Sequence, residues 1–153
     1  MSELNNCLLP DDLLYHVQSN IWLRQHDDQT IEMGMTDIAQ TMAGNIIHCR
    51  PKALGKMVKA GKSIATVESG KWVGPVRCSV GGEIVAVNEA VAADATLLNK
   101  SPYKQGWIIR LMPTDFTADK GELVSGADAL AGFKDYMAEN ELGECIHCEG
   151  FDG

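Results

Sequence analysis

Short apolar runs separated by turn-forming residues dominate the first part of the chain. Residues 14–23 are rich in β-forming side chains, and Ser19-Asn20 interrupts them, which predicts a β-hairpin. A polar turn then precedes an apolar run over residues 30–35, which we expect to form the next strand. The hydrophobic pattern of residues 14–35 therefore predicts β-strands.

A short helix is predicted directly after these strands. Ile38, Ala39 and Met42 recur at helical spacing, so they would share one buried face. The Thr36 hydroxyl can accept a hydrogen bond from the first turn, and Gly44 suits the position just past the last turn. We expect the helix to lie between these two residues.

Residues 45–113 return to a β-rich pattern with frequent glycines. Short strands with frequent turn signals are typical of a sandwich or a flattened barrel. Pro75 cannot donate a ladder hydrogen bond, so its strand should be an edge strand or be broken there. Candidate strands span residues 45–50, 63–68, 72–80, 83–88 and 107–112.

Two short segments of the chain are weakly similar to each other. Gly44-Asn45-Ile46-Ile47 is similar to Gly82-Glu83-Ile84-Val85, and each is followed by a polar loop and another apolar segment. This similarity favours two halves of one β-domain related by a pseudo-twofold axis.

The C-terminal part divides into a helix and a tail. Leu130, Phe133 and Met137 recur at spacings of three and four residues, which predicts a helix over about 126–142. Residues 144–153 are polar and acidic, and we expect a flexible, cysteine-containing tail there. We interpret residues 1–143 as a single domain.

Composition narrows the range of partners. The 153 residues are 45% apolar and carry a formal net charge of −8. A negative charge disfavours nucleic acid and anionic membranes, because binding to both depends on basic side chains. The polar, acidic N-terminus lacks the basic start and apolar run of a secretory signal. We therefore expect a cytoplasmic protein, monomeric, that does not bind membranes or nucleic acid.

The chain has five cysteines, an odd number, and the expected cytoplasmic compartment is reducing. Structural disulfides are therefore not expected. Cys49 and Cys78 lie in apolar strand patterns and are expected to be packed thiols. Cys7 and the Cys145–Cys148 pair lie near the chain ends, where they are either inert reduced thiols or take a redox role with a partner or cofactor. A zinc site is not predicted, because no second Cys-x-x-Cys completes a set of four ligands.

The segment that carries most chemical information runs from Glu68 to Trp72. An apolar strand leads into Glu68-Ser69-Gly70, then Lys71, then a second apolar strand. Gly70 offers freedom for a tight turn, which would hold Lys71 at the tip of a hairpin, pointing into water. The local pattern alone also fits an ordinary solvated turn lysine, since Lys62 likewise follows a glycine.

Several blocks of residues occur along the chain in the order and at the spacing of one known family. These blocks are Gly34-Met35-Thr36-Asp37-Ile38-Ala39-Gln40, Glu68-Ser69-Gly70-Lys71, Pro75 with Gly81-Gly82-Glu83-Ile84-Val85 and Asn88-Glu89, and Asn99-Lys100-Ser101-Pro102-Tyr103 with Gly106-Trp107-Ile108. Through these blocks, residues from about 15 to 137 resemble the H protein of the glycine cleavage system.

This resemblance implies a mainly β fold with small helices, a flattened β-barrel or sandwich of the lipoyl type known as a barrel-sandwich hybrid. It also implies lipoate in amide linkage on Lys71, with Glu68, Ser69 and Gly70 forming the attachment turn. A lipoate ligase or lipoyltransferase would attach it. The lipoyl disulfide can be reduced and can carry a group between active sites. The protein would then be a carrier that acts with enzymes and not an enzyme itself.

Several positions depart from the family pattern. Asn20-Ile21-Trp22 stands where the family has His-Glu-Trp, Gly70 replaces a valine, and Trp72 replaces a small residue. Residues 7–13, together with Tyr15 and then Trp22, are similar to the lipoate-binding proteins of bacterial sulfur oxidation. Sulfur cargo and a heterodisulfide-reductase-like complex are therefore the favoured expectation.

Three alternatives stay open. The first is the aminomethyl carrier of glycine cleavage, with those enzymes, including a dihydrolipoamide dehydrogenase, as partners. The second is an unmodified interaction module with the same fold. The third, a biotinyl carrier, is disfavoured because Gly70 and Trp72, not methionines, flank Lys71.

Overall fold

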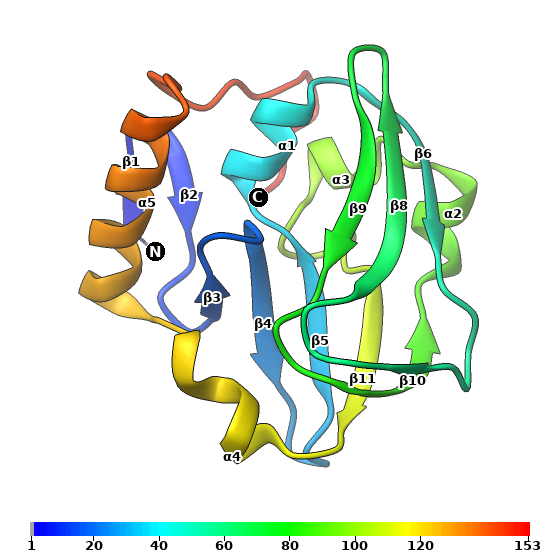
Figure 1. The fold of residues 1–153 in the computed structure, drawn as a ribbon. Coiled ribbons are helices and arrows are strands. Elements are labelled where there is room, and N and C mark those ends of the chain that lie inside the picture. Colours follow the sequence, from blue (N-terminus) through cyan, green and yellow to red (C-terminus); the bar gives the residue numbers. More distant parts are fainter. Residues whose placement is uncertain (1) are drawn as a thin grey trace.

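Antiparallel sheets form the framework of the computed structural model, which describes residues 2–153 (Figure 1). The largest sheet has six strands in the order β3-β4-β5-β11-β10-β7, and a second has three in the order β6-β8-β9. A two-stranded hairpin of β1 and β2 lies at the N-terminus. The strands are β1 (Ser2–Leu4), β2 (Cys7–Leu9), β3 (Leu14–His16), β4 (Ile21–Gln25), β5 (Ile31–Met35), β6 (Ile46–Pro51), β7 (Met57–Val58), β8 (Ser63–Ser69), β9 (Val73–Arg77), β10 (Gly82–Val87) and β11 (Ile109–Pro113).

Short helices connect and flank the sheets. Beyond the two predicted helices, the structure adds three short helices and a 3₁₀ turn that the sequence pattern did not predict. The helices are α1 (Asp37–Ala43), α2 (Glu89–Ala93), α3 (Leu97–Lys100), α4 (Phe116–Asp119), the 3₁₀ turn η1 (Lys120–Glu122) and α5 (Gly126–Glu139). No helix within residues 2–153 combines the length and apolar character needed to cross a bilayer.

The predicted hairpin over residues 14–23, which is β3–β4, and the predicted helix α1 are confirmed. The residues that form the turn and the helix caps are those expected from the sequence. β3 pairs with β4, and Asn20 in the turn between them takes a left-handed φ of 59°. Thr36 Oγ accepts a hydrogen bond from the Ala39 N–H at 3.0 Å and so caps α1. Gly44 ends the helix at φ 79°, and its N–H donates to the Gln40 carbonyl at 3.1 Å.

Some predicted bounds need correction. The strand expected over 72–80 stops at Arg77, and the strand expected from 107 starts at Ile109. α5 ends at Glu139, three residues short of the predicted end. Pro75 lies on β9, which is an edge of its three-stranded sheet, as a residue without an N–H requires.

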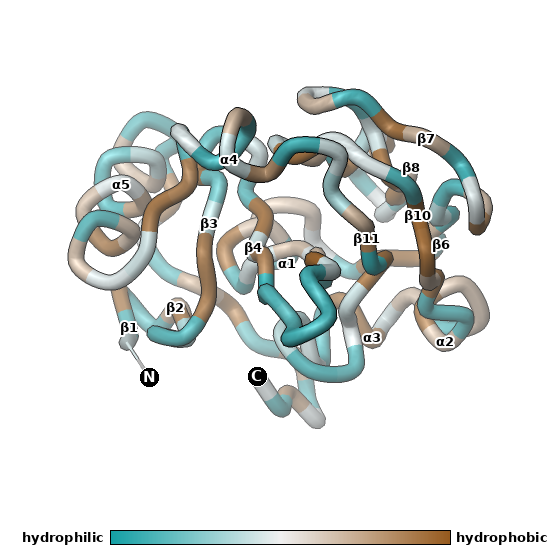
Figure 2. The backbone as a smooth tube through the Cα atoms, turned by 90° about the horizontal axis from the view of Figure 1, so that it is seen from below, coloured by the Kyte–Doolittle hydropathy of each residue, from teal (hydrophilic) through white to brown (hydrophobic). Residues whose placement is uncertain are grey.

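The main core lies where the three-stranded and six-stranded sheets bring their apolar side chains together. Figure 2 shows the apolar segments concentrated in the strands and the hydrophilic ones in the connecting loops. One apolar cluster joins both sheets, including Ile64 and Val67 from β8 and Ile84 from β10. Cys49 and Cys78 belong to it as free thiols, and burial raises their pKa values to about 12 and about 11. This sandwich agrees with the predicted fold class.

A second apolar cluster holds the chain ends together. Phe133 and Met137 of α5 pack with Tyr15 of β3, Trp22 of β4 and Cys7 of β2. α5 thereby covers one flank of the six-stranded sheet next to the N-terminal hairpin (Figure 1).

The C-terminal segment corrects the expectation of a flexible tail over 144–153. It runs from the end of α5 across α1 and is held by specific contacts (Figure 1). The Ile146 N–H donates to Thr41 Oγ at 3.2 Å, and His147 Nε2 donates to Asp37 Oδ2 at 2.7 Å. The His147 ring stacks on Phe151 with centroids 3.7 Å apart.

Candidate functional site

Lys71 lies at the tip of the β8–β9 hairpin, as the sequence predicted. Glu68 pairs with Val73, and the Ser69 N–H donates to the Trp72 carbonyl at 2.7 Å, which closes the turn. The Lys71 N–H donates to Ser69 Oγ at 3.3 Å. The structure thus brings together all four predicted attachment residues, with Ser69 buried as the turn's internal support.

Gly70 does not take the role that the sequence suggested. It is absent from the glycines of residues 2–153 with positive φ, and a Cβ added there would meet no atom within 4 Å. Neither backbone conformation nor crowding therefore requires glycine at this position. Gly70 leaves open space next to Lys71, because it has no side chain.

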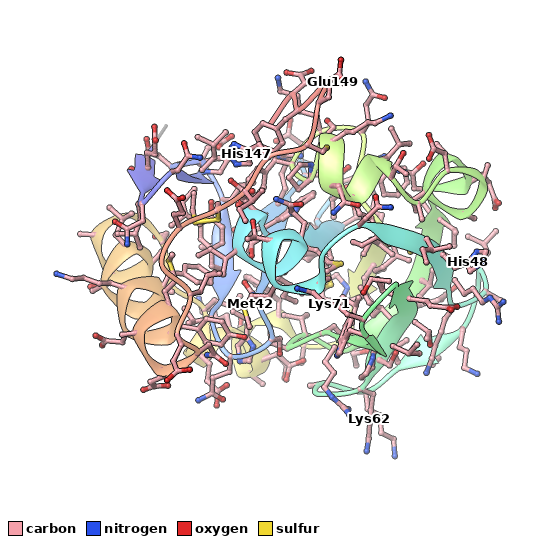
Figure 3. The ribbon with its side chains drawn as sticks, turned by 90° about the horizontal axis from the view of Figure 1, so that it is seen from above. Met42, His48, Lys62, Lys71, His147 and Glu149 are labelled. Carbon is pink, nitrogen blue, oxygen red and sulfur yellow. A yellow bond between two sulfur atoms is a disulfide. The ribbon has the colours of Figure 1, made fainter. Side chains whose placement is uncertain are left out.

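The Lys71 side chain is exposed, yet it lies along α1 (Figure 3). A Cβ at Gly44 would lie 3.0 Å from Lys71 Cε and 3.7 Å from its Nζ. Gly44 therefore serves two purposes, because it ends the helix and leaves room for the lysine. The ammonium lies at the C-terminal end of α1, where the backbone carbonyls favour a positive charge.

A cavity of about 470 Å³ opens beside this lysine. Its size is in the range of small-molecule sites, and most of its lining side chains are apolar. The side chains come from the β3–β4 turn, β5, α1, the β8–β9 hairpin and α5, and none of the lining residues within 2–153 is acidic. They are Ser19, Asn20, Met35, Ala39, Met42, Ala43, Lys71, Trp72, Pro75, Val76 and Tyr136.

Two lining residues, Asn20 and Tyr136, supply neighbouring polar groups to the cavity. Asn20 is buried; its Oδ1 accepts a hydrogen bond from Thr36 Oγ, and its Nδ2 lies 3.8 Å from the Met42 sulfur. Tyr136 projects from α5, and partial burial raises its pKa. Tyr136 was not among the site residues predicted from the sequence, whereas Asn20 stood out there as a departure from the family pattern.

Trp72 closes the hairpin side of the cavity. A Cβ at Gly74 would lie 2.3 Å from Trp72 Cζ2, so the ring rests directly on the glycine. Trp72 is 40% exposed, which leaves one part of the ring in solvent beside Lys71. The tryptophan that follows the lysine, where the family has a small residue, therefore packs on Gly74, which has no side chain in its way.

The terminal cysteines are arranged differently from the prediction. Cys7 and Cys145 form a disulfide across a sequence separation of 138 residues, and both are buried. The expectation of no structural disulfide is therefore wrong. Cys148 is a free, exposed thiol and does not pair with Cys145. The bond ties β2 to the segment that follows α5.

Asp37 connects these terminal segments to α1. It is fully buried, and its carboxylate accepts hydrogen bonds from the Leu8 N–H at 2.9 Å and from His147. Gln40 Nε2 donates to the same carboxylate at 2.8 Å and to the Ile146 carbonyl at 3.0 Å. The helix beneath Lys71 is therefore anchored at its N-terminal end by both chain termini.

Residues 2–153 hold no group of three or more potential ligands placed for a metal ion.

Sandwiched sheets that present one exposed lysine at a hairpin tip, next to a mostly apolar cavity, define the class of lipoyl-type carrier domains. Comparison with known proteins extends this assignment. A family model described as "Glycine cleavage H-protein" matches residues 13–136.

Similar proteins carry the same family name. The chain is 39% identical to glycine cleavage system H protein 2 of Aquifex aeolicus over 93% of its own length and 88% of the relative's. It is 41% identical to H protein 3 of the same organism over 95% and 92%. A crystal structure of a glycine cleavage system H protein from Mycobacterium marinum superposes with a TM-score of 0.71 at 27% identity, covering 88% of this chain and 100% of that one.

The chain belongs to the glycine cleavage H-protein family. Proteins of this family carry lipoate covalently attached to a lysine, and they are carriers that work with glycine cleavage enzymes and lipoyl ligases. The expected sulfur-oxidation branch finds no support in these relatives, which are named for glycine cleavage.

Proposed function

We propose that this protein carries lipoate on Lys71 and serves as the aminomethyl carrier of a glycine cleavage system. The observation that carries the proposal is the placement of Lys71, exposed at the closed tip of a regular hairpin and beside a cavity. The family assignment supports lipoate as the cofactor, and the hairpin geometry supports Lys71 as its attachment site.

Other lysines are less suitable as acceptors. Lys62 also follows a glycine, Gly61, which has a φ of 85°. The Lys62 carbonyl accepts a hydrogen bond from the Cys78 N–H, so Lys62 lies in the loop before β8 and not at the tip of a hairpin. A modifying enzyme that recognises a β-hairpin would find the strand–turn–strand frame of Glu68, Ser69 and Gly70 at Lys71 and not at Lys62. A lipoate ligase or lipoyltransferase is the partner class that this frame fits.

The residues around Lys71 would position and shelter the attached arm. Amide formation removes the ammonium charge, and with it the attraction to the C-terminal end of α1. An apolar chain then gains from contact with Met35, Met42 and Trp72, because each removes apolar surface from water. When bound, lipoate supplies a disulfide that can be reduced and can carry a transferred group.

A lysine exchange with a matched control tests the site. Lys71→Arg keeps the charge but cannot be acylated, whereas Lys62→Arg changes a lysine that also follows a glycine. Peptide mass spectrometry on protein from native cells should find a lipoyl increment on the Lys71 peptide in the wild type and in Lys62→Arg, and none in Lys71→Arg. A lipoyl group on another lysine would refute the assignment.

One observation favours a second cargo. An aminomethyl group is cationic at neutral pH, and none of the described residues lining the cavity carries a carboxylate to pair with it. Ile21, at the family's usual glutamate position, lies in the core with no exposed surface. A neutral or anionic sulfur compound, exchanged with a heterodisulfide-reductase-like complex, fits this lining as well.

Reconstitution separates the two cargoes. The lipoylated protein would be mixed with the other glycine cleavage enzymes, and the release of labelled CO₂ from glycine would be measured. Turnover that depends on Lys71 supports the aminomethyl carrier. Absence of turnover, with another H protein active in the same mixture, would transfer the proposal to the sulfur cargo.

A further inference from the structure

The charge of this chain is divided sharply along the sequence. Residues 45–82 contain seven Lys or Arg residues and one acid, Glu68, for a net charge of +6. The remaining residues contain six Lys or Arg residues and 20 acids, for a net charge of −14. A protein with a total charge of −8 therefore carries a strongly basic region, which the overall charge conceals.

Four exposed side chains of this region form what we call the basic pole. Among the ion pairs of residues 2–153, none involves a member of the pole. Two large apolar side chains lie among these cations, Leu54 at 66% exposure and Met57 at 62%. The members of the basic pole are Lys56, Lys59, Lys62 and Arg77.

The backbone under the basic pole is firmly held. The Gly61 N–H donates to the Cys78 carbonyl at 2.6 Å, and the Cys78 N–H donates to the Lys62 carbonyl at 2.9 Å. The Ile84 N–H donates to the Lys56 carbonyl at 2.9 Å, which fixes the loop to β10. Arg77 pairs with Ser63 across β9 and β8. The cations are thus displayed on an ordered frame, which lowers the entropy lost when a partner binds.

The basic pole and Lys71 occupy opposite ends of the β8–β9 hairpin. β8 runs from Ser63 to Ser69, which corresponds to about 20 Å at ~3.3 Å per residue. In Figure 1 the hairpin tip projects at one end while the loop before β8 lies at the other, and in Figure 3 Lys62 points away from the body, far from Lys71. A partner seated on the pole would leave the tip uncovered.

We infer that the basic pole is a docking surface for an acidic face on the enzymes that act on the Lys71 arm. This inference rests on the proposed carrier function. Unpaired exposed cations would steer such a face by long-range attraction, while the −14 remainder would repel it and so orient the encounter. Leu54 and Met57 supply apolar contact within a charged rim, the usual composition of a transient interface.

Other polyanions fit this surface less well. A nucleic acid extends beyond a patch of this size and would meet the acidic remainder, which opposes the phosphate neutralisation that binding requires. An anionic membrane is a plane, so it would also bring its charge close to the acidic remainder. Acidic side chains also border the pole, since Glu83 pairs with Met57. One cavity is lined by Gly61 together with Asp119 and Glu122. A compact acidic face on a protein can contact the cations without extending over these carboxylates.

Two triple variants with equal charge change test the inference. Lys56→Glu/Lys59→Glu/Lys62→Glu reverses the pole, and Lys100→Glu/Lys120→Glu/Lys134→Glu reverses three exposed lysines elsewhere. Lipoylated proteins would be assayed as substrates of dihydrolipoamide dehydrogenase from the same cells at about 20 mM and about 300 mM salt. We expect the pole variant to raise KM about tenfold at low salt with kcat unchanged, and the difference to shrink at high salt. The control should stay within about twofold of wild type.

Equal KM changes in both variants, or none in either, would overturn the docking inference while leaving the carrier function intact. Pole-dependent sedimentation with phosphatidylserine vesicles, without an effect on KM, would overturn it in favour of a membrane. Free lipoamide serves as the enzyme control. If it is turned over while wild-type protein is not, the proposed function itself fails.

Discussion

Removal of the Cys7–Cys145 disulfide is the perturbation for which the structure gives the clearest magnitude. The bond closes a loop whose cysteines are 138 residues apart, almost the whole chain. In the chain-entropy treatment, a loop of this length restricts the unfolded state by about 5 kcal/mol. Both sulfurs lie in the second apolar cluster, so replacement by alanine keeps an apolar filling there.

The loss should be visible as a lower melting temperature. Unfolding entropy of about 2.1 cal/mol/K per residue gives about 0.3 kcal/mol/K for a chain of this length, so about 5 kcal/mol corresponds to about 15 °C. Two hydrogen bonds remain in the variant and hold the C-terminal segment in place: the backbone N–H of residue 145 donates to the Asn5 carbonyl, and Asn6 Nδ2 donates to the carbonyl of residue 145. The native fold should persist at room temperature.

Calorimetry on a Cys7→Ala/Cys145→Ala protein, with Cys148→Ala as the matched control, measures this effect. The control changes an exposed free thiol and should melt within about 1 °C of wild type, as surface substitutions do. A double variant that melts within about 3 °C of wild type would refute the reasoning, because ~1 kcal/mol is far below the entropy of so long a loop.

Three further predictions follow from local geometry. Gly74→Ala places a methyl group where the Trp72 ring lies, so the ring should move into solvent and the tryptophan fluorescence should shift to longer wavelength. Iodoacetamide at pH 8 should label Cys148 and leave Cys49 unlabelled in the folded protein, because burial raises the Cys49 pKa to about 12 and suppresses its thiolate; mass spectrometry of the labelled protein reads this directly. Thr36→Ala should lower the free energy of unfolding in urea by about 1 kcal/mol, since α1 loses its cap; Thr36→Ser, which keeps the hydroxyl, should recover most of it.

The sequence by itself determined the parts of this protein that depend on neighbouring residues. Thr36 and Gly44 mark the ends of α1 because a cap acts within one turn. Two apolar segments around Ser69 and Gly70 predicted the hairpin that presents Lys71, because a turn is closed by residues next to one another. The spaced blocks of the whole chain were sufficient to identify the family.

Only the tertiary structure decided which distant residues meet. Cys7 lies beside Cys145 because β2 and the segment after α5 pack on the same cluster, a pairing that cysteine spacing does not reveal. The cavity combines side chains from separate strands and helices, so no single segment predicts it. The basic residues were visible in the sequence, but their position at the end of the hairpin opposite Lys71 depends on how β8 and β9 are paired. Local propensity acts over a few residues, whereas these features depend on burial and pairing between segments that are far apart in the chain.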